Sequence, residues 1–242
     1  MYTLAKVAAL LAGAYALKAQ SPTGPAVPNV SFEYGPLVDR PCYATAKLPL
    51  DTTLIRATAR RVPIWRDAWA RKAPELFRTA AAITHSTYSF AETKAAIITC
   101  PTYVSMSLPL MINVAKLFRD DTVPVANDTT QFVSLLFHEN LHRHISDLIR
   151  ARPDSTTPLL TKYAAEAPVV LAHLHLLALM DTVYRQVGRV SNLLRPSGRS
   201  APLAGGYRGE NDMDRAREIV RTEGVAAFIR ELQPNRASSP RH

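Results

Sequence analysis

The sequence predicts an α+β fold that is mainly helical, and three observations carry this prediction. Hydrophobic residues occupy 47% and charged residues 20% of the 242 positions, which is the balance of an ordinary globular chain. Glycine occurs only nine times, and alanine-rich stretches are frequent. Apolar residues recur every three or four positions over most of the chain, whereas one short stretch alternates with a period of two. An all-β sandwich and a collagen-like chain are therefore excluded.

Residues 1–19 have the layout of a secretory signal peptide. Lys6 precedes an apolar run that is too short to span a bilayer, and small residues follow at Ala16 and Ala19. We therefore expect the mature protein to be secreted or periplasmic, and we expect no transmembrane anchor.

The remaining chain is expected to form one domain. Residues 20–30 are rich in proline and predict a linker, residues 31–233 predict a single domain, and residues 234–242 predict a disordered basic tail. Cys42 and Cys100 are the only cysteines, and in an oxidising compartment they could form one disulfide.

The net charge of +9 comes from 29 Lys and Arg residues against 20 Asp and Glu residues. The basic residues are scattered along the chain rather than gathered in runs, a pattern that is typical of a solvated surface. We expect no nucleic-acid partner.

The elements are expected in the following order. Apolar spacing predicts helices, one of them interrupted by Pro74, and the alternation around Ser105-Met106-Ser107 predicts a short antiparallel pair of strands. Capping side chains precede the strongest helix, which Pro153 closes, and Pro168 predicts a kink or break in the stretch that follows. The expected helices cover about 51–61, 64–82, 127–150, 159–187 and 210–232, and the expected strands cover 94–100 and 103–114.

The strongest helix contains the segment His138-Glu139-Asn140-Leu141-His142. Four residues make slightly more than one helical turn, so His138 and His142 lie on one face and can offer two imidazole nitrogens to one Zn²⁺ ion. Glu139 lies one step round the helix, where its carboxylate can take a proton from a zinc-bound water. This is the HExxH pattern of zinc metallopeptidases.

These residues resemble the zincin superfamily of metallopeptidases. The resemblance implies a small sheet ahead of the motif helix, an edge strand that pairs with the extended substrate, and a third metal ligand from a later segment. The segment from Lys94 to Val114 is suitably placed to form that sheet. Two features depart from the pattern. Arg143 follows the second histidine, where zincins usually have an uncharged residue, and the Gly-x-x-His continuation of metzincins is absent.

The third ligand is expected from the stretch after Pro158. If a helix that begins there returns antiparallel to the motif helix, Glu166 reaches the level of His142. Glutamate in this role resembles the gluzincin arrangement, and His173, two turns later, would stabilise the oxyanion of the tetrahedral intermediate. In the alternative assignment His173 is the ligand and Glu166 accepts a hydrogen bond from a ligand. His175 is a third candidate.

The sequence thus predicts an exported zinc metallopeptidase that hydrolyses peptide bonds, with Glu139 as general base, His173 as a second catalytic residue, and His138, His142 and Glu166 as ligands of Zn²⁺. Its expected partner is a peptide or protein substrate. One alternative is a catalytically inactive, zinc-stabilised basic binding protein of the cell envelope, and another is a helical interaction domain without metal. An open coordination position distinguishes the first from the second, because structural zinc sites are normally closed by four protein ligands.

Overall fold

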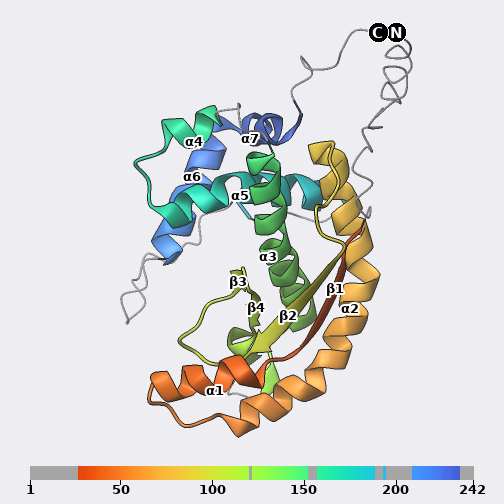
Figure 1. Ribbon diagram of the computed structural model, residues 1–242, viewed down its shortest axis with the longest axis vertical. Coiled ribbons are helices and arrows are strands. Elements are labelled where there is room, and N and C mark those ends of the chain that lie inside the picture. The colour runs from red at the N-terminus through yellow and green to blue at the C-terminus, as the bar shows by residue number, and fades with distance from the viewer. Residues whose placement is uncertain (1–26, 120–121, 152–156, 189–192, 195–208, 235–242) are drawn as a thin grey trace, which may run out of the picture.

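The structure is a computed structural model that describes residues 27–119, 122–151, 157–188, 193–194 and 209–234. The predicted signal peptide, most of the predicted linker and all of the predicted tail except Pro234 lie outside these residues. The described chain is α+β and mainly helical, as predicted, and its small sheet precedes the motif helix (Figure 1). None of the helices in the described part combines the length and apolar character needed to cross a membrane.

The described residues form one four-stranded sheet, one two-stranded ribbon, a 3₁₀ turn and seven helices. In chain order they are β1 (Asn29–Tyr34), α1 (Pro36–Thr45), α2 (Thr52–Thr84), β2 (Glu92–Ile98), β3 (Met106–Ser107), β4 (Leu110–Asn113), the turn (Ala115–Leu117), β5 (Phe118–Arg119), β6 (Val123–Pro124), α3 (Asp128–Arg150), α4 (Pro158–Lys162), α5 (Pro168–Gln186), α6 (Gly209–Glu223) and α7 (Val225–Leu232).

The sheet has the strand order β1-β2-β4-β3. The expected antiparallel pairing of 94–100 with 103–114 is wrong, because β2 pairs with β4 in parallel and the antiparallel partner of β4 is β3. The reason is that the chain leaves β2, turns back through β3 and turns again, so that β4 runs in the direction of β2. Strand β3 therefore lies at the edge of the sheet, as an edge strand antiparallel to its neighbour.

Two elements of the N-terminal part differ from the sequence prediction. Strand β1 begins at Asn29, inside the predicted linker, and it buries Val30 and Phe32 against the core in strict alternation. Helix α2 is continuous through Pro63 and Pro74 over 33 residues, although two helices were expected. A proline inside a helix costs about 3 kcal/mol. The long buried stripe of α2 outweighs this cost, and the helix curves around β1 and α3 (Figure 1).

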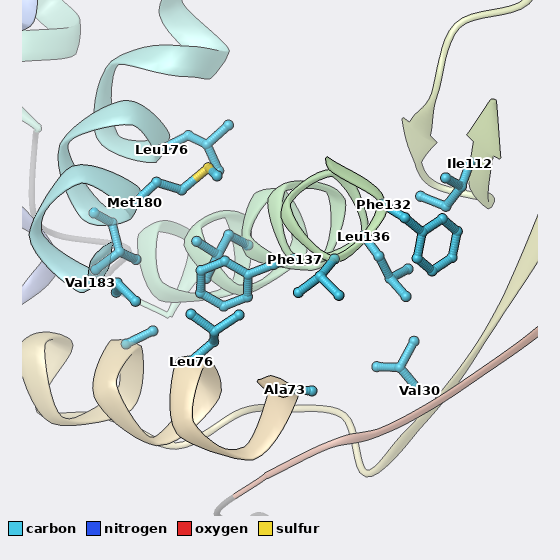
Figure 2. Packing of buried hydrophobic residues seen from close by; sticks show 14 of the residues in the cluster. Val30, Ala73, Leu76, Ile112, Phe132, Leu136, Phe137, Leu176, Met180 and Val183 are labelled. Carbon is cyan, nitrogen blue, oxygen red and sulfur yellow. The ribbon is translucent and has the colours of Figure 1, made fainter. Parts of the chain in front are cut away.

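The core lies where α3 is enclosed by α2 on one side and α5 on the other. Leu76 of α2, Phe137 of α3 and Met180 of α5 meet there, and none of them is more than 1% exposed (Figure 2). The motif helix is therefore held by packing along most of its length, which fixes the positions of the side chains on its remaining face.

The predicted disulfide is present. Cys42 of α1 and Cys100, just after β2, are bonded across 58 positions of sequence, and both are fully buried. The bond ties α1 to the end of the sheet.

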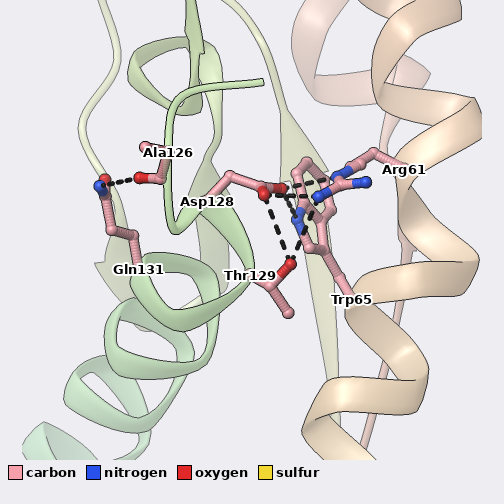
Figure 3. A network of polar contacts seen from close by, with 6 residues as sticks. All are labelled: Arg61, Trp65, Ala126, Asp128, Thr129 and Gln131. Carbon is pink, nitrogen blue, oxygen red and sulfur yellow. Dashed lines mark hydrogen bonds and ion pairs between the residues drawn. The ribbon is translucent and has the colours of Figure 1, made fainter. Parts of the chain in front are cut away.

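The first turn of α3 is anchored to α2 by a buried polar cluster (Figure 3). Arg61 donates to both carboxylate oxygens of Asp128, at 2.7 and 2.5 Å, and the indole nitrogen of Trp65 donates to the same carboxylate at 2.7 Å. Burial alone would raise the pKa of Asp128, but the hydrogen bonds from Arg61 and Trp65 outweigh it and hold the pKa below its ordinary value. The charged carboxylate therefore stabilises the fold at neutral pH, and this contribution is lost as the pH falls below about 4.

We expect Asp128→Ala to lower the free energy of unfolding by about 3 kcal/mol, because it leaves the Arg61 guanidinium and the Trp65 N–H without their acceptor. Urea denaturation measures this change. Asp67→Ala removes an exposed carboxylate of α2 and serves as the control. It should change the free energy of unfolding by less than about 0.5 kcal/mol. A loss below about 1 kcal/mol in Asp128→Ala would contradict the anchoring role.

Candidate metal centre

Helix α3 brings His138 and His142 together on one face. Their Nε2 atoms are 3.2 Å apart. Two nitrogens bound to one tetrahedral zinc ion at about 2.0–2.1 Å each would be separated by about 3.3 Å. The two imidazoles thus already lie at the separation that a shared zinc ion requires.

Helix α5 adds a third imidazole. One donor atom each from His138, His142 and His173 lies within 4.8 Å of the other two, and the ring centroids of His142 and His173 are 4.8 Å apart. The Nδ1 atom of His173 lies 2.6 Å from the carbonyl oxygen of Val169, and because a carbonyl can only accept, Nδ1 must donate. In a neutral ring this leaves the lone pair on Nε2, the form that binds a metal.

The protonation of the cluster also fits a metal. Burial, and then the neighbouring His142 and His173, lower the pKa of His138 well below its ordinary value. Burial and His173 lower the pKa of His142 to about 4, and burial lowers that of His173. All three rings are therefore neutral at pH 7, as ligands must be. Three imidazoles with an open fourth position are the donor set of a catalytic zinc site.

Glu139 lies beside this cluster rather than in it. Its Oε1 atom is 3.9 Å from Nε2 of His138, and the side chain is only 6% exposed. Burial raises the pKa of Glu139 to about 7. A carboxyl group with such a pKa, next to the donor atoms, can exchange a proton at neutral pH.

Glu166 is not brought to the two histidines, which corrects the preferred choice of third ligand. Its Oε1 atom accepts hydrogen bonds from Arg215 at 2.6 and 2.9 Å. The expected helix from Pro158 is interrupted, since α4 ends at Lys162 and α5 begins at Pro168, so that Glu166 lies in the connection between them. A proline disfavours helical backbone at the residue before it, and Ala167 is extended, with ψ 144°.

The path of α5 is a second reason why Glu166 does not reach the two histidines. This helix crosses α3 instead of running alongside it (Figures 1 and 2), so only a short part of α5 comes near the histidine pair. His173 is in that part. The structure therefore favours the alternative assignment, with His173 among the possible ligands, and it does not support the role of Glu166 as hydrogen-bond acceptor for a ligand either.

His175 and His144 belong to the interior. His175 is 2% exposed, and its Nε2 atom lies 2.8 Å from a carboxylate oxygen of Glu231. His144 is 1% exposed, faces Thr84, and has a pKa that burial lowers to about 4. Both are on helix faces that point away from the cluster.

Sequence reasoning missed the contribution of Val169, which orients His173 through its backbone carbonyl. No side-chain pattern could have revealed this, because every residue type carries the same carbonyl group.

Comparisons of the chain with protein-family models, with curated proteins and with solved structures find no match.

Proposed function

We propose that this protein is an exported zinc-dependent metallopeptidase that hydrolyses peptide bonds. The observation that carries the proposal is the convergence of three neutral imidazoles from α3 and α5 beside the buried carboxylate of Glu139. The HExxH segment on α3 resembles that of the zincins, and its two histidines have the spacing that a shared metal needs.

In the proposed hydrolysis the metal and the side chains have different roles. Bound zinc would polarise the scissile carbonyl and lower the pKa of a water molecule toward about 7. Glu139 accepts a proton from the attacking water and passes it to the departing amine. His138, His142 and His173 would hold the metal beside that carboxylate, and the packed core around α3 keeps these side chains in place.

The edge strand β3 supplies a place for the substrate. It packs against α3, and Met106 within it and Leu108 just after it are 36% and 61% exposed. An extended peptide can add to such an edge through main-chain hydrogen bonds. A peptide bound in this way would lie along the sheet, close to the helix that carries Glu139.

Export is part of the proposal. The disulfide between Cys42 and Cys100 is of the kind that persists in oxidising compartments. Together with the signal-peptide layout of residues 1–19, it supports a secreted or periplasmic protein.

The number of donors favours catalysis over a structural zinc site. In the described residues three side chains meet at the cluster, whereas structural zinc is normally closed by four. The inactive zinc-stabilised binding protein of the cell envelope remains the outcome that a negative activity test would favour.

Zinc analysis and hydrolysis of a peptide library by the mature chain test the proposal. We expect about one zinc ion per chain, hydrolysis that a chelator abolishes, and recovery when zinc is added back. One bound zinc without hydrolysis of any peptide would favour the inactive binding protein, and no bound zinc would favour the metal-free interaction domain.

We expect zinc affinity to change by less than about tenfold between pH 7.5 and pH 5.5. Protons compete with zinc only below the pKa of a ligand, and the pKa of His142 is about 4 instead of its ordinary 6.5. Three histidines with ordinary pKa values would together lose about 100-fold or more over this interval. Competition with a chelating dye at each pH measures the affinity, and a loss of that larger size would contradict the lowered pKa values.

A further inference from the structure

A second feature adjoins the candidate metal centre. A cavity of about 140 Å³ lies between α3 and the sheet, and it is lined by residues of β2, of the β3–β4 hairpin and of α3. Its polar lining includes Lys94, Ser107 and Arg143. Arg143 is the charged residue that follows the second histidine, and the proposed hydrolysis gives it no task.

The cavity lies on the far side of Glu139 from the histidines. Residues four apart on a helix are offset by about 40°, so Arg143 lies on the same face as Glu139 and one turn further on. Moving round α3, one meets the histidine pair, then Glu139, then Arg143. A substrate that reaches Glu139 would therefore lie about one helical turn from Arg143, which lines the cavity.

Arg143 is held in place by two contacts. Its Nη1 atom donates to Oγ1 of Thr93 at 3.0 Å, and its guanidinium carbon lies 4.3 Å from the centre of the Phe90 ring. Both contacts restrain the side chain, and neither neutralises its charge. A restrained guanidinium loses little conformational entropy when it binds a carboxylate.

In the described part of the chain, no carboxylate forms an ion pair with Arg143 or with Lys94. Arg143 is half-buried, where a cation gains most from an anionic partner. A ligand that supplies a carboxylate would complete this environment.

The edge strand connects the cavity to the substrate. Ser107 of β3 lines the cavity, and β3 is the strand to which an extended peptide can add. Side chains of an extended peptide alternate between the two faces of a sheet, so one of them points toward α3 at this position.

We infer that this cavity is a subsite for an acidic side chain of the peptide substrate, bound by Arg143 and Lys94 close to the scissile bond. The inference rests on the proposed peptidase function and adds a substrate class to it, namely peptides with Asp or Glu near the cleavage point.

Matched fluorogenic peptides test the inference. Peptides that differ only in Glu, Gln or Lys at each position next to the cleaved bond are compared by kcat/KM. At one position we expect Glu to exceed Gln by about tenfold or more, which is the size of a hydrogen bond to a charged group. Equal rates for Glu and Gln at every position would overturn the inference.

Two variants assign the preference to the cavity. Lys94→Ala changes an exposed side chain, and Arg143→Gln keeps part of the stem and a hydrogen-bond donor. A Glu-to-Gln ratio that falls toward one in either variant supports the subsite, and a ratio that is unchanged in both overturns it. If Arg143→Gln does not fold, Lys94→Ala alone decides. Lys72→Ala, which removes an exposed lysine of α2, is the matched control and should leave the ratio unchanged.

A binding measurement separates the two possible failures. Fluorescence anisotropy with labelled Glu and Gln peptides is carried out on zinc-loaded Glu139→Gln, which needs no turnover. If no peptide is hydrolysed but the Glu peptide binds more tightly, the peptidase proposal fails and the acidic subsite stands. If peptides are hydrolysed and the two affinities are equal, the subsite fails and the peptidase proposal stands.

Discussion

His173→Ala is expected to weaken zinc binding by more than about 100-fold, whereas Glu166→Gln is expected to leave it unchanged. Loss of a residue that only supports a ligand commonly costs 10- to 100-fold in metal affinity, so loss of a ligand costs more. One ring nitrogen of His173 lies within 4.8 Å of one from His138 and one from His142, and the hydrogen bond of Nδ1 to Val169 leaves the Nε2 lone pair free for a metal. The carboxylate of Glu166 instead forms an ion pair with Arg215.

Zinc content after dialysis and competition with a chelating dye measure this difference. His85→Asn serves as control, because it removes an exposed imidazole that lies outside the cluster, and asparagine tolerates the left-handed backbone of that position, where φ is 50°. The opposite pattern, with zinc lost in Glu166→Gln and kept in His173→Ala, would restore the gluzincin-like assignment.

Glu139→Gln is expected to keep about one zinc ion per chain and to lose 10²- to 10⁴-fold in kcat, the usual contribution of a general base. Glutamine has nearly the shape of glutamate, so the packing of this buried position is preserved, but the amide cannot accept the proton of the attacking water. Zinc affinity should be retained, because the converging ligand atoms belong to His138, His142 and His173 and Glu139 is not among them.

Parallel zinc analysis and peptide hydrolysis distinguish this outcome from unfolding. Glu75→Gln, which changes an exposed glutamate of α2 in the same way, should keep full activity. Full activity in Glu139→Gln would remove the proposed general base, and loss of zinc in the same variant would mean that the carboxylate acts as a ligand.

Part of the candidate site could be predicted from local sequence, and part depends on contacts between distant segments. His138, Glu139 and His142 follow from the sequence because all three lie within five consecutive residues of one helix, where side-chain positions depend on spacing alone. The third donor lies 31 positions beyond His142, and its identity depends on how α5 crosses α3. The choice of Glu166 assumed one continuous helix from Pro158 that runs antiparallel to α3. In the structure the chain between Lys162 and Pro168 is not helical, and a new helix, α5, begins at Pro168.

The fold shows the same division. The motif helix from Asp128 to Arg150 and the position of the sheet ahead of it could be read from periodicity, although Asn127 makes no side-chain capping hydrogen bond. The direction of β2 relative to β4 and the existence of β1 could not, because strands are stabilised by partners that are remote in sequence. The continuity of α2 through Pro63 and Pro74 likewise comes from its packing against the rest of the molecule.

The sequence by itself determined that a helix presents two imidazoles and a carboxylate at the spacing of a zinc site, since backbone geometry sets that arrangement without help from the remainder of the chain. The tertiary structure alone decided three further points: His173 lies beside these side chains, Glu166 forms an ion pair with Arg215, and Arg143 lines a cavity without an ion-pair partner among the described residues. These three outcomes depend on which helices cross and where, and that is set by the burial of apolar surface over the whole domain.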